Sequence, residues 1–117
     1  MIRLSMDYQI NNKEQGKMKN KYTMIINSSK GDIYGNRYGY IDIVDNDTGK
    51  TKSYKTGWCD SGASNEKSIA HRLGDCNIVM RSDIPIRQFN RESKGLTHLN
   101  TSGNSVEKAE MIKELLK

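Results

Sequence analysis

Two tyrosines separated by one glycine, Tyr38 and Tyr40, have the types and spacing best suited to binding chemistry in this chain. Side chains at positions i and i+2 of a β-strand point to the same face of the sheet. Aromatic rings exposed in this way can stack on nucleic-acid bases, and each stacked base contributes about 1–3 kcal/mol. Basic side chains nearby can bind phosphate groups. We therefore predict one binding surface made of Arg37, Tyr38, Tyr40, Lys52 and Lys55.

The Tyr-Gly-Tyr-Ile stretch at residues 38–41 resembles the centre of the RNP1 motif of cold-shock and RNA-recognition domains. In that motif an aromatic-glycine-aromatic-aliphatic strand carries the stacking rings. The chain departs from the motif at Asn36 and Arg37, where a basic residue followed by glycine is usual. The resemblance implies direct binding of single-stranded DNA or RNA through the two tyrosines.

Metal binding is not indicated by the spacing of the soft ligands, which are Cys59, His71, Cys76 and His98. Zinc sites usually take their ligands in close pairs, such as two cysteines separated by two to four residues. These four residues do not contain such a pair. We therefore expect no metal ion and no other cofactor.

Catalysis is a further hypothesis with two variants. Cys59 and His71 would supply a nucleophile and a base, although no nucleophile-elbow pattern surrounds Cys59. A metal nuclease would need carboxylates and a lysine on adjacent strands. The residues that would fill that role are Asp42, Asp45, Glu66 and Lys52. Because their spacing follows no pattern typical of such a site, we predict that the protein is not an enzyme.

A β-hairpin over residues 37–58 is predicted to carry the tyrosines. Residues 37–44 and 51–58 have the composition of strands. Residues 45–50 between them are rich in turn-forming side chains, and Gly49 suits a left-handed backbone conformation. The sequence therefore predicts this hairpin as the central element of the fold.

Strand alternation assigns the two faces of the hairpin. Ile41 and Ile43 are expected to pack on the core, so Tyr38 and Tyr40 are expected to stand on the outer face. A turn that pairs Asp45 with Lys50 would place Tyr40 opposite Lys55 and Ile41 opposite Tyr54. On that register the core face also receives two aromatic residues, Tyr54 and Trp58.

The remaining elements complete an α+β domain. Helices are predicted over residues 65–73 and 105–116, and further strands over residues 22–27 and 76–81. Pro85 confines residues 84–89 to an extended edge or a loop. The predicted fold is therefore α+β, with a small antiparallel sheet of about four strands, a prominent central hairpin and two short helices.

The length and composition are those of one small domain. The chain has 117 residues, of which 34% are hydrophobic, and its mean hydropathy is −0.82. We expect residues 1–20 to form a loosely ordered arm and residues 21–117 to form a single α+β domain. No apolar stretch approaches the about 18 residues of a membrane span. With no signal-peptide pattern at the N-terminus, we expect no membrane association and a cytoplasmic location, the host cytoplasm if the protein is viral.

The surface charge and composition suggest the class of partner. A net charge of +5 argues against an acidic DNA mimic and permits contact with nucleic acid, an acidic protein face or an anionic membrane surface. Its small size and richness in Asn, Lys, Ile and Tyr resemble accessory proteins of phages and other mobile elements. Many of these inhibit host nucleic-acid machinery, including the anti-CRISPR class. The resemblance implies an anti-defence inhibitor or regulator that occupies a surface of a host protein or nucleoprotein complex.

Overall fold

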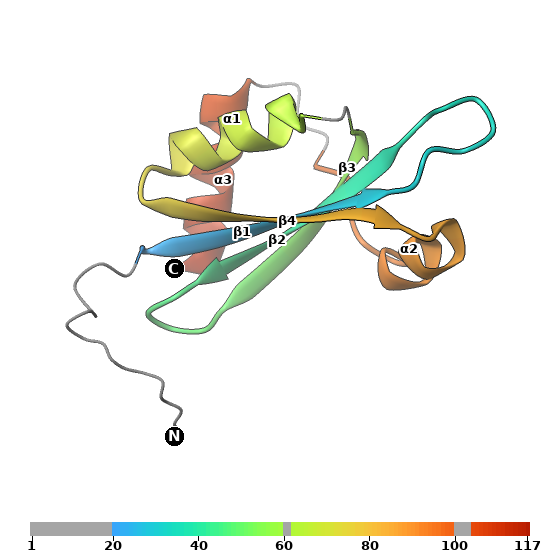
Figure 1. Cartoon of the computed structure of the whole chain (residues 1–117). Coiled ribbons are helices and arrows are strands. Elements are labelled where there is room, and N and C mark those ends of the chain that lie inside the picture. Colours follow the sequence, from blue (N-terminus) through green and yellow to red (C-terminus); the bar gives the residue numbers. More distant parts are fainter. Residues whose placement is uncertain (1–19, 60–61, 100–103) are drawn as a thin grey trace.

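A computed structural model describes residues 20–59, 62–99 and 104–117, so the arm expected at residues 1–20 lies outside the described residues apart from Asn20. The strands are β1 (Tyr22–Ser29), β2 (Tyr38–Asp45), β3 (Thr51–Trp58) and β4 (Cys76–Ile84), and the helices are α1 (Ser64–Leu73), α2 (Ile86–Glu92) and α3 (Ser105–Leu116). The sheet has the order β3-β2-β1-β4. Helices α1 and α3 cover one face, and α2 lies at one end of the sheet (Figure 1). The predicted α+β class is confirmed.

The turn between β2 and β3 sets the register of the hairpin. The Asp45 N–H donates to the Lys50 carbonyl at 2.8 Å. Tyr40 therefore lies opposite Lys55, and Ile41 opposite Tyr54, as the turn pairing predicts. Short-range turn chemistry is enough to determine this part of the fold.

The register shifts by one residue at the far end of the hairpin. Gly39 lies opposite Gly57, and Tyr38 lies opposite Trp58. Gly57 has a φ of +81°, a conformation that glycine adopts without strain. Such a bulge bends the strand and interrupts the alternation of its side chains. The Trp58 side chain is outside the described part of the structure, so its expected place on the core face stays a prediction.

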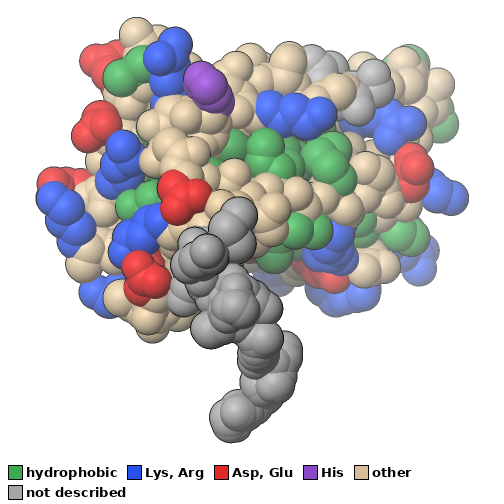
Figure 2. Space-filling view, turned by 60° about the vertical axis from the view of Figure 1, so that its left-hand side comes forward, with side chains coloured by type: hydrophobic (Ala, Val, Ile, Leu, Met, Phe, Trp, Pro, Cys, Tyr) green, Lys and Arg blue, Asp and Glu red, His purple; other side chains and the backbone are tan. Residues whose placement is uncertain are grey.

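The direction of β4 differs from the expected antiparallel arrangement. β1 pairs antiparallel with β2 but parallel with β4, so the sheet is mixed. The reason is α1, which connects β3 to β4 across one face of the sheet. Parallel strands require a crossover of this kind, usually a helix. No strand of the described residues pairs with the outer edge of β4, and Figure 2 shows hydrophobic side chains gathered across this side of the molecule.

Residues 84–89 do not form the extended segment expected from Pro85. Pro85 precedes the first turn of α2, with a φ of −53°. Proline is well tolerated at a helix start, because its fixed φ suits the helix and its missing N–H is not needed there. Phe89 of α2 is buried beside Tyr40, with the two ring centroids 5.4 Å apart. The contact of Phe89 with Tyr40, which is distant in the sequence, favours the helix because it buries the Phe89 ring.

The main core lies between the sheet and the pair α1 and α3. Its fully buried side chains include Met24, Ile26, Ile41, Ile43 and Ile112. Both helices follow the predicted ranges closely, and α3 begins with a capping box. In that box Asn104 accepts from the Glu107 N–H and Glu107 accepts from the Asn104 N–H. None of the described helices is long and apolar enough to cross a membrane.

Candidate binding hollow between the hairpin and α2

A hollow of about 250 Å³ lies where the end of the hairpin meets α2 and the segment that follows it. We call it the hairpin hollow. Its lining includes Tyr38, Gly39, Lys55, Gly57, Phe89 and His98. They come from β2, β3, α2 and the loop before α3, and the fold brings them together.

Two glycines line the hollow and differ in their surroundings. Gly39 and Gly57 lie opposite each other on β2 and β3. Gly39 is buried, and a Cβ added there would lie 2.8 Å from the Thr56 Oγ1 and 3.0 Å from the Cys59 Cβ, so it would point toward packed atoms. A Cβ added at Gly57 would meet open space. The bare backbone at this point can be approached closely by a flat group.

Tyr38 supplies an aromatic ring at the rim of the hollow. Its side chain is 37% exposed, and its hydroxyl donates to Asp32 Oδ2 at 3.3 Å. Asp32 is held in turn by the backbone N–H groups of Tyr34 and Asn36. These hydrogen bonds, chiefly the one from Asn36, lower the pKa of Asp32, so it remains an anionic acceptor. The turn therefore orients the exposed Tyr38 ring.

Lys55 and His98 are brought to the hollow by a short segment that pairs with the edge of β3. The Lys55 N–H donates to the Thr97 carbonyl at 2.9 Å, and the Leu99 N–H donates to the Lys55 carbonyl at 2.7 Å. Leu99 is buried in the main core and anchors the segment. The sequence alone points to His98 only as a soft metal ligand. The one available signal for its position was Leu99, an apolar residue within a polar stretch.

Tyr40 does not take part in an exposed surface, which corrects the prediction of two outward rings. It does lie on the strand face opposite Ile41, but α2 covers it and leaves 5% of it exposed. Its hydroxyl donates to Glu92 Oε1 at 3.0 Å, and Arg81 donates to the same Glu92 oxygen at 3.2 Å. Burial, followed by the bond to Glu92, raises the pKa of Tyr40. Tyr40 therefore anchors α2 and cannot stack on a base.

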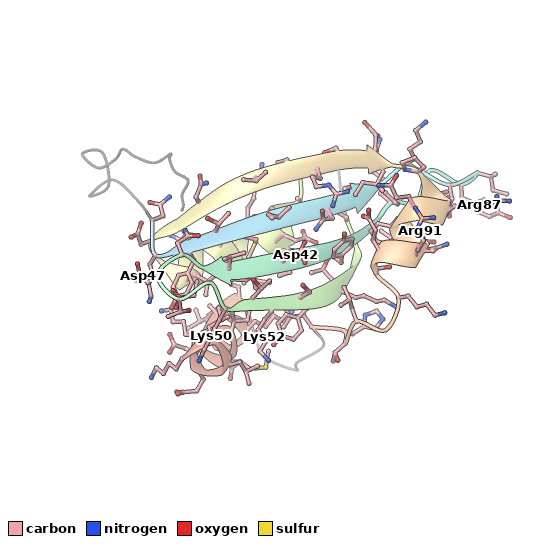
Figure 3. All side chains as sticks on the ribbon, turned by 90° about the horizontal axis from the view of Figure 1, so that it is seen from below. Asp42, Asp47, Lys50, Lys52, Arg87 and Arg91 are labelled. Carbon is pink, nitrogen blue, oxygen red and sulfur yellow. The ribbon has the colours of Figure 1, made fainter. Side chains whose placement is uncertain are left out.

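Two of the predicted basic residues are placed apart from the hollow. Arg37 forms an ion pair with Asp83 at 2.9 Å. Lys52 lies directly opposite Ile43, so its side chain is on the face of the hairpin that carries Ile43 and not on the face that carries Tyr38. Figure 3 shows Lys52 near Lys50, away from α2. Of the five predicted residues, the structure gathers only Tyr38 and Lys55 at the hollow.

The residues of the catalytic hypotheses lie in different environments. Cys59 is buried in the main core, whereas His71 is exposed on α1. Asp42 accepts hydrogen bonds from Asn27 and Ser53 on the outer face of the sheet. Glu66 is instead buried on α1, which covers the opposite face. Within the described ranges, no three His, Cys, Asp or Glu residues lie close enough to hold a metal ion.

The chemistry available in the hairpin hollow is that of a binding site: an aromatic ring, an imidazole, an ammonium group and bare backbone. No protein-family model matches the chain, and comparison with curated proteins and with solved structures gave no match either. Its function therefore has to be inferred from its own residues.

Proposed function

We propose that the protein is a non-catalytic binding protein that occupies a surface of a host nucleic-acid-handling complex, as an inhibitor or regulator of the anti-defence kind. The observation that carries this proposal is the hairpin hollow, where the exposed Tyr38 ring and the half-buried Lys55 lie beside the bare backbone of Gly57. Tyrosine is enriched among residues that dominate binding energy, and such residues cluster in hollows. The hollow is thus a suitable anchor point for a protruding side chain of a partner.

The charge around the hollow favours an acidic partner surface. Arg87 and Arg91 project from α2 at the same end of the sheet (Figure 3). Neither appears in an ion pair, and Lys55 has none either, within the part of the chain that the structure describes. Complementary charge speeds association and selects partners more than it adds affinity. Surfaces of complexes that handle nucleic acid offer both acidic patches and phosphate groups.

Direct binding of single-stranded nucleic acid is the second candidate, favoured by the pairing of Tyr38 with Lys55. Stacking contributes about 1–3 kcal/mol per base, so affinity for free nucleic acid grows with the number of rings in a row. With Tyr40 beneath α2, the hairpin offers one exposed ring rather than two. A protein or nucleoprotein surface is therefore the better-supported partner.

The two candidates can be separated by one set of measurements. Binding of short fluorescent single-stranded DNA and RNA is followed by anisotropy at low and moderate salt. Direct binding should weaken steeply as salt rises, because counterions released from the phosphates oppose it. A protein inhibitor should show little affinity for the free strands. It should instead bind a purified nucleic-acid-handling complex of its host and reduce that complex's activity.

Matched tyrosine variants test the hollow itself. Tyr38→Ala should weaken binding at least about tenfold, the range of an interface anchor. Tyr34→Ala is the control, because Tyr34 is also an exposed tyrosine but is not among the residues that line the hollow. Equal effects of the two substitutions would contradict the hollow as the binding site. If single-stranded nucleic acid binds in a salt-sensitive way and Tyr38→Ala abolishes this binding, direct nucleic-acid binding replaces the protein-surface proposal.

A further inference from the structure

β4 forms one edge of the sheet and is exposed over nearly its whole length. Every residue from Asn77 to Asp83 is exposed. Three consecutive apolar residues lie within this stretch, with exposed fractions of 38% for Ile78, 41% for Val79 and 40% for Met80. An exposed apolar edge strand is a ready template for pairing with another strand.

The parallel pairing with β1 determines which backbone groups of β4 face outward. Tyr22 lies opposite Cys76, and its N–H donates to the Asp75 carbonyl at 2.9 Å. In a parallel pair, a residue does not bond to the residue directly opposite it. It bonds to the residues before and after that one on the other strand. Odd-numbered residues of β4 therefore direct their backbone groups toward β1. The even-numbered Ile78 and Met80 direct their N–H and carbonyl groups away from the sheet.

The opposite edge of the sheet is protected, in contrast to β4. Along β3 the segment that ends at Leu99 bonds both backbone groups of Lys55. The same strand carries a second lysine, Lys52, and edge lysines discourage pairing between sheets. Within the described residues, the middle of β4 has no covering segment, proline or charge. One edge of the sheet is protected and the other is not. This difference indicates that β4 is a surface for pairing with another strand.

We propose that β4 pairs antiparallel with β4 of a second copy of this chain, about a two-fold axis that passes beside Val79. In this arrangement Ile78 of each copy lies opposite Met80 of the other, and the two exchange backbone hydrogen bonds. Val79 lies opposite Val79 of the second copy on the outer face. The two four-stranded sheets then form one continuous sheet with a symmetric interface.

The pattern of side chains selects this axis over its neighbours. Only the even-numbered residues of β4 have outward backbone groups, so hydrogen-bonded pairs between the copies must join two even-numbered residues. The two-fold axis can therefore lie beside one residue of β4 or the next, but not between residues. An axis at Ile78 would place Val79 opposite Asn77, and an axis at Met80 would place it opposite Arg81. The axis at Val79 pairs apolar with apolar residues on both faces. It also sets Arg81 opposite Asn77, which keeps the two arginines apart.

Charged substitutions at the axis test both the dimer and its register. Sedimentation equilibrium of the wild-type chain should show a dimer that dissociates on dilution. Val79→Lys and Val79→Glu should each be monomeric, because like charges directly opposite destabilise a strand pair. An equimolar mixture of the two variants should recover the dimer, because a lysine then faces a glutamate. Thr51→Lys, an exposed position at the start of the β3 edge, should leave the dimer intact.

A disulfide test gives an independent readout of the same contact. At a non-hydrogen-bonded antiparallel pair the Cα atoms are about 4.5 Å apart, which is within the range of a disulfide. Val79→Cys should therefore form a covalent dimer on mild oxidation, and the wild-type chain should not. A wild-type chain that is monomeric at all concentrations would overturn the proposal. A dimer that the mixed variants do not restore, or that Val79→Cys does not cross-link, would overturn the register.

Discussion

At the scale of single residues, Glu66 places one oxygen of a buried carboxyl group where no described residue bonds it. Its side chain is 1% exposed, and Oε2 accepts no hydrogen bond from the described part of the chain. Removing a carboxylate from water without compensation costs free energy. Glu66 lies on the buried face of α1 together with Ile69 and Leu73. Its position is therefore one where an apolar side chain would pack better.

We expect Glu66→Leu to raise the free energy of unfolding by about 1–3 kcal/mol, the cost of an unsatisfied buried polar group. Urea denaturation followed by circular dichroism measures this change. Lys67→Leu is the matched control, because Lys67 is exposed on the same helix and should change stability by less than about 0.5 kcal/mol. A loss of stability in Glu66→Leu would mean that the carboxylate makes favourable interactions.

At the scale of elements, the turn of the hairpin combines one glycine with one carboxylate. Gly49 has a φ of +79°, and its N–H donates to the Asp45 carbonyl at 2.7 Å. The Asp45 carboxylate accepts from the N–H groups of Asp47 and Thr48 and lies 3.0 Å from Lys21 Nζ. The bond to Lys21 is the main cause of the lowered pKa of Asp45. These contacts explain why the hairpin register follows from local sequence.

We expect Gly49→Val to destabilise the protein by about 1–3 kcal/mol, because a β-branched residue resists positive φ. The space around Gly49 is open, so the strain comes from the backbone and not from a clash. Gly49→Asn is the control at the same site and should cost less, since asparagine tolerates this conformation. Thermal unfolding of the two variants compares them. Equal melting temperatures would show that the left-handed conformation is not required.

At the scale of the whole molecule, α2 is held by a small cluster separate from the main core. The apolar part of the cluster consists of Tyr40, Ile84 and the α2 residue Phe89, and Leu96 packs against them. The polar contacts converge on Glu92, which accepts from Gln88, Tyr40 and Arg81. The bond from Gln88 is the largest of the causes that lower the pKa of Glu92. The hairpin hollow depends on α2, so loss of this cluster would open the site.

We expect α2 to loosen in acid because Glu92 is bound as the anion. A carboxylate whose pKa is lowered by folding stabilises the docked state above its ordinary pKa, and that stabilisation is lost as pH falls through the lowered value. NMR shifts of residues 86–92 should therefore show a local transition below about pH 4. Glu92→Gln should remove this transition, and Glu114→Gln, in an exposed pair with Lys117, should not. A transition that persists in Glu92→Gln would contradict the role of Glu92.

The sequence by itself determined the hairpin register from the turn as far as Tyr40 and, to within one residue, the bounds of α1 and α3. These features depend on residues close together in the chain, such as Asp45 with Lys50 or Asn104 with Glu107. Alternation also assigned Tyr40 and Ile41 correctly to opposite faces of β2. The physical reason is that turns, caps and strand alternation are set by backbone geometry over a few residues.

Only the tertiary structure decided the direction of β4, the burial of Tyr40 and the place of His98. Each depends on contacts between residues distant in sequence: β4 with β1, Phe89 with Tyr40, and the segment at Leu99 with Lys55. The pattern of apolar residues identifies which face of a strand is buried in the main core. It does not specify which distant helix covers the other face, because that follows from the packing energy of the whole fold.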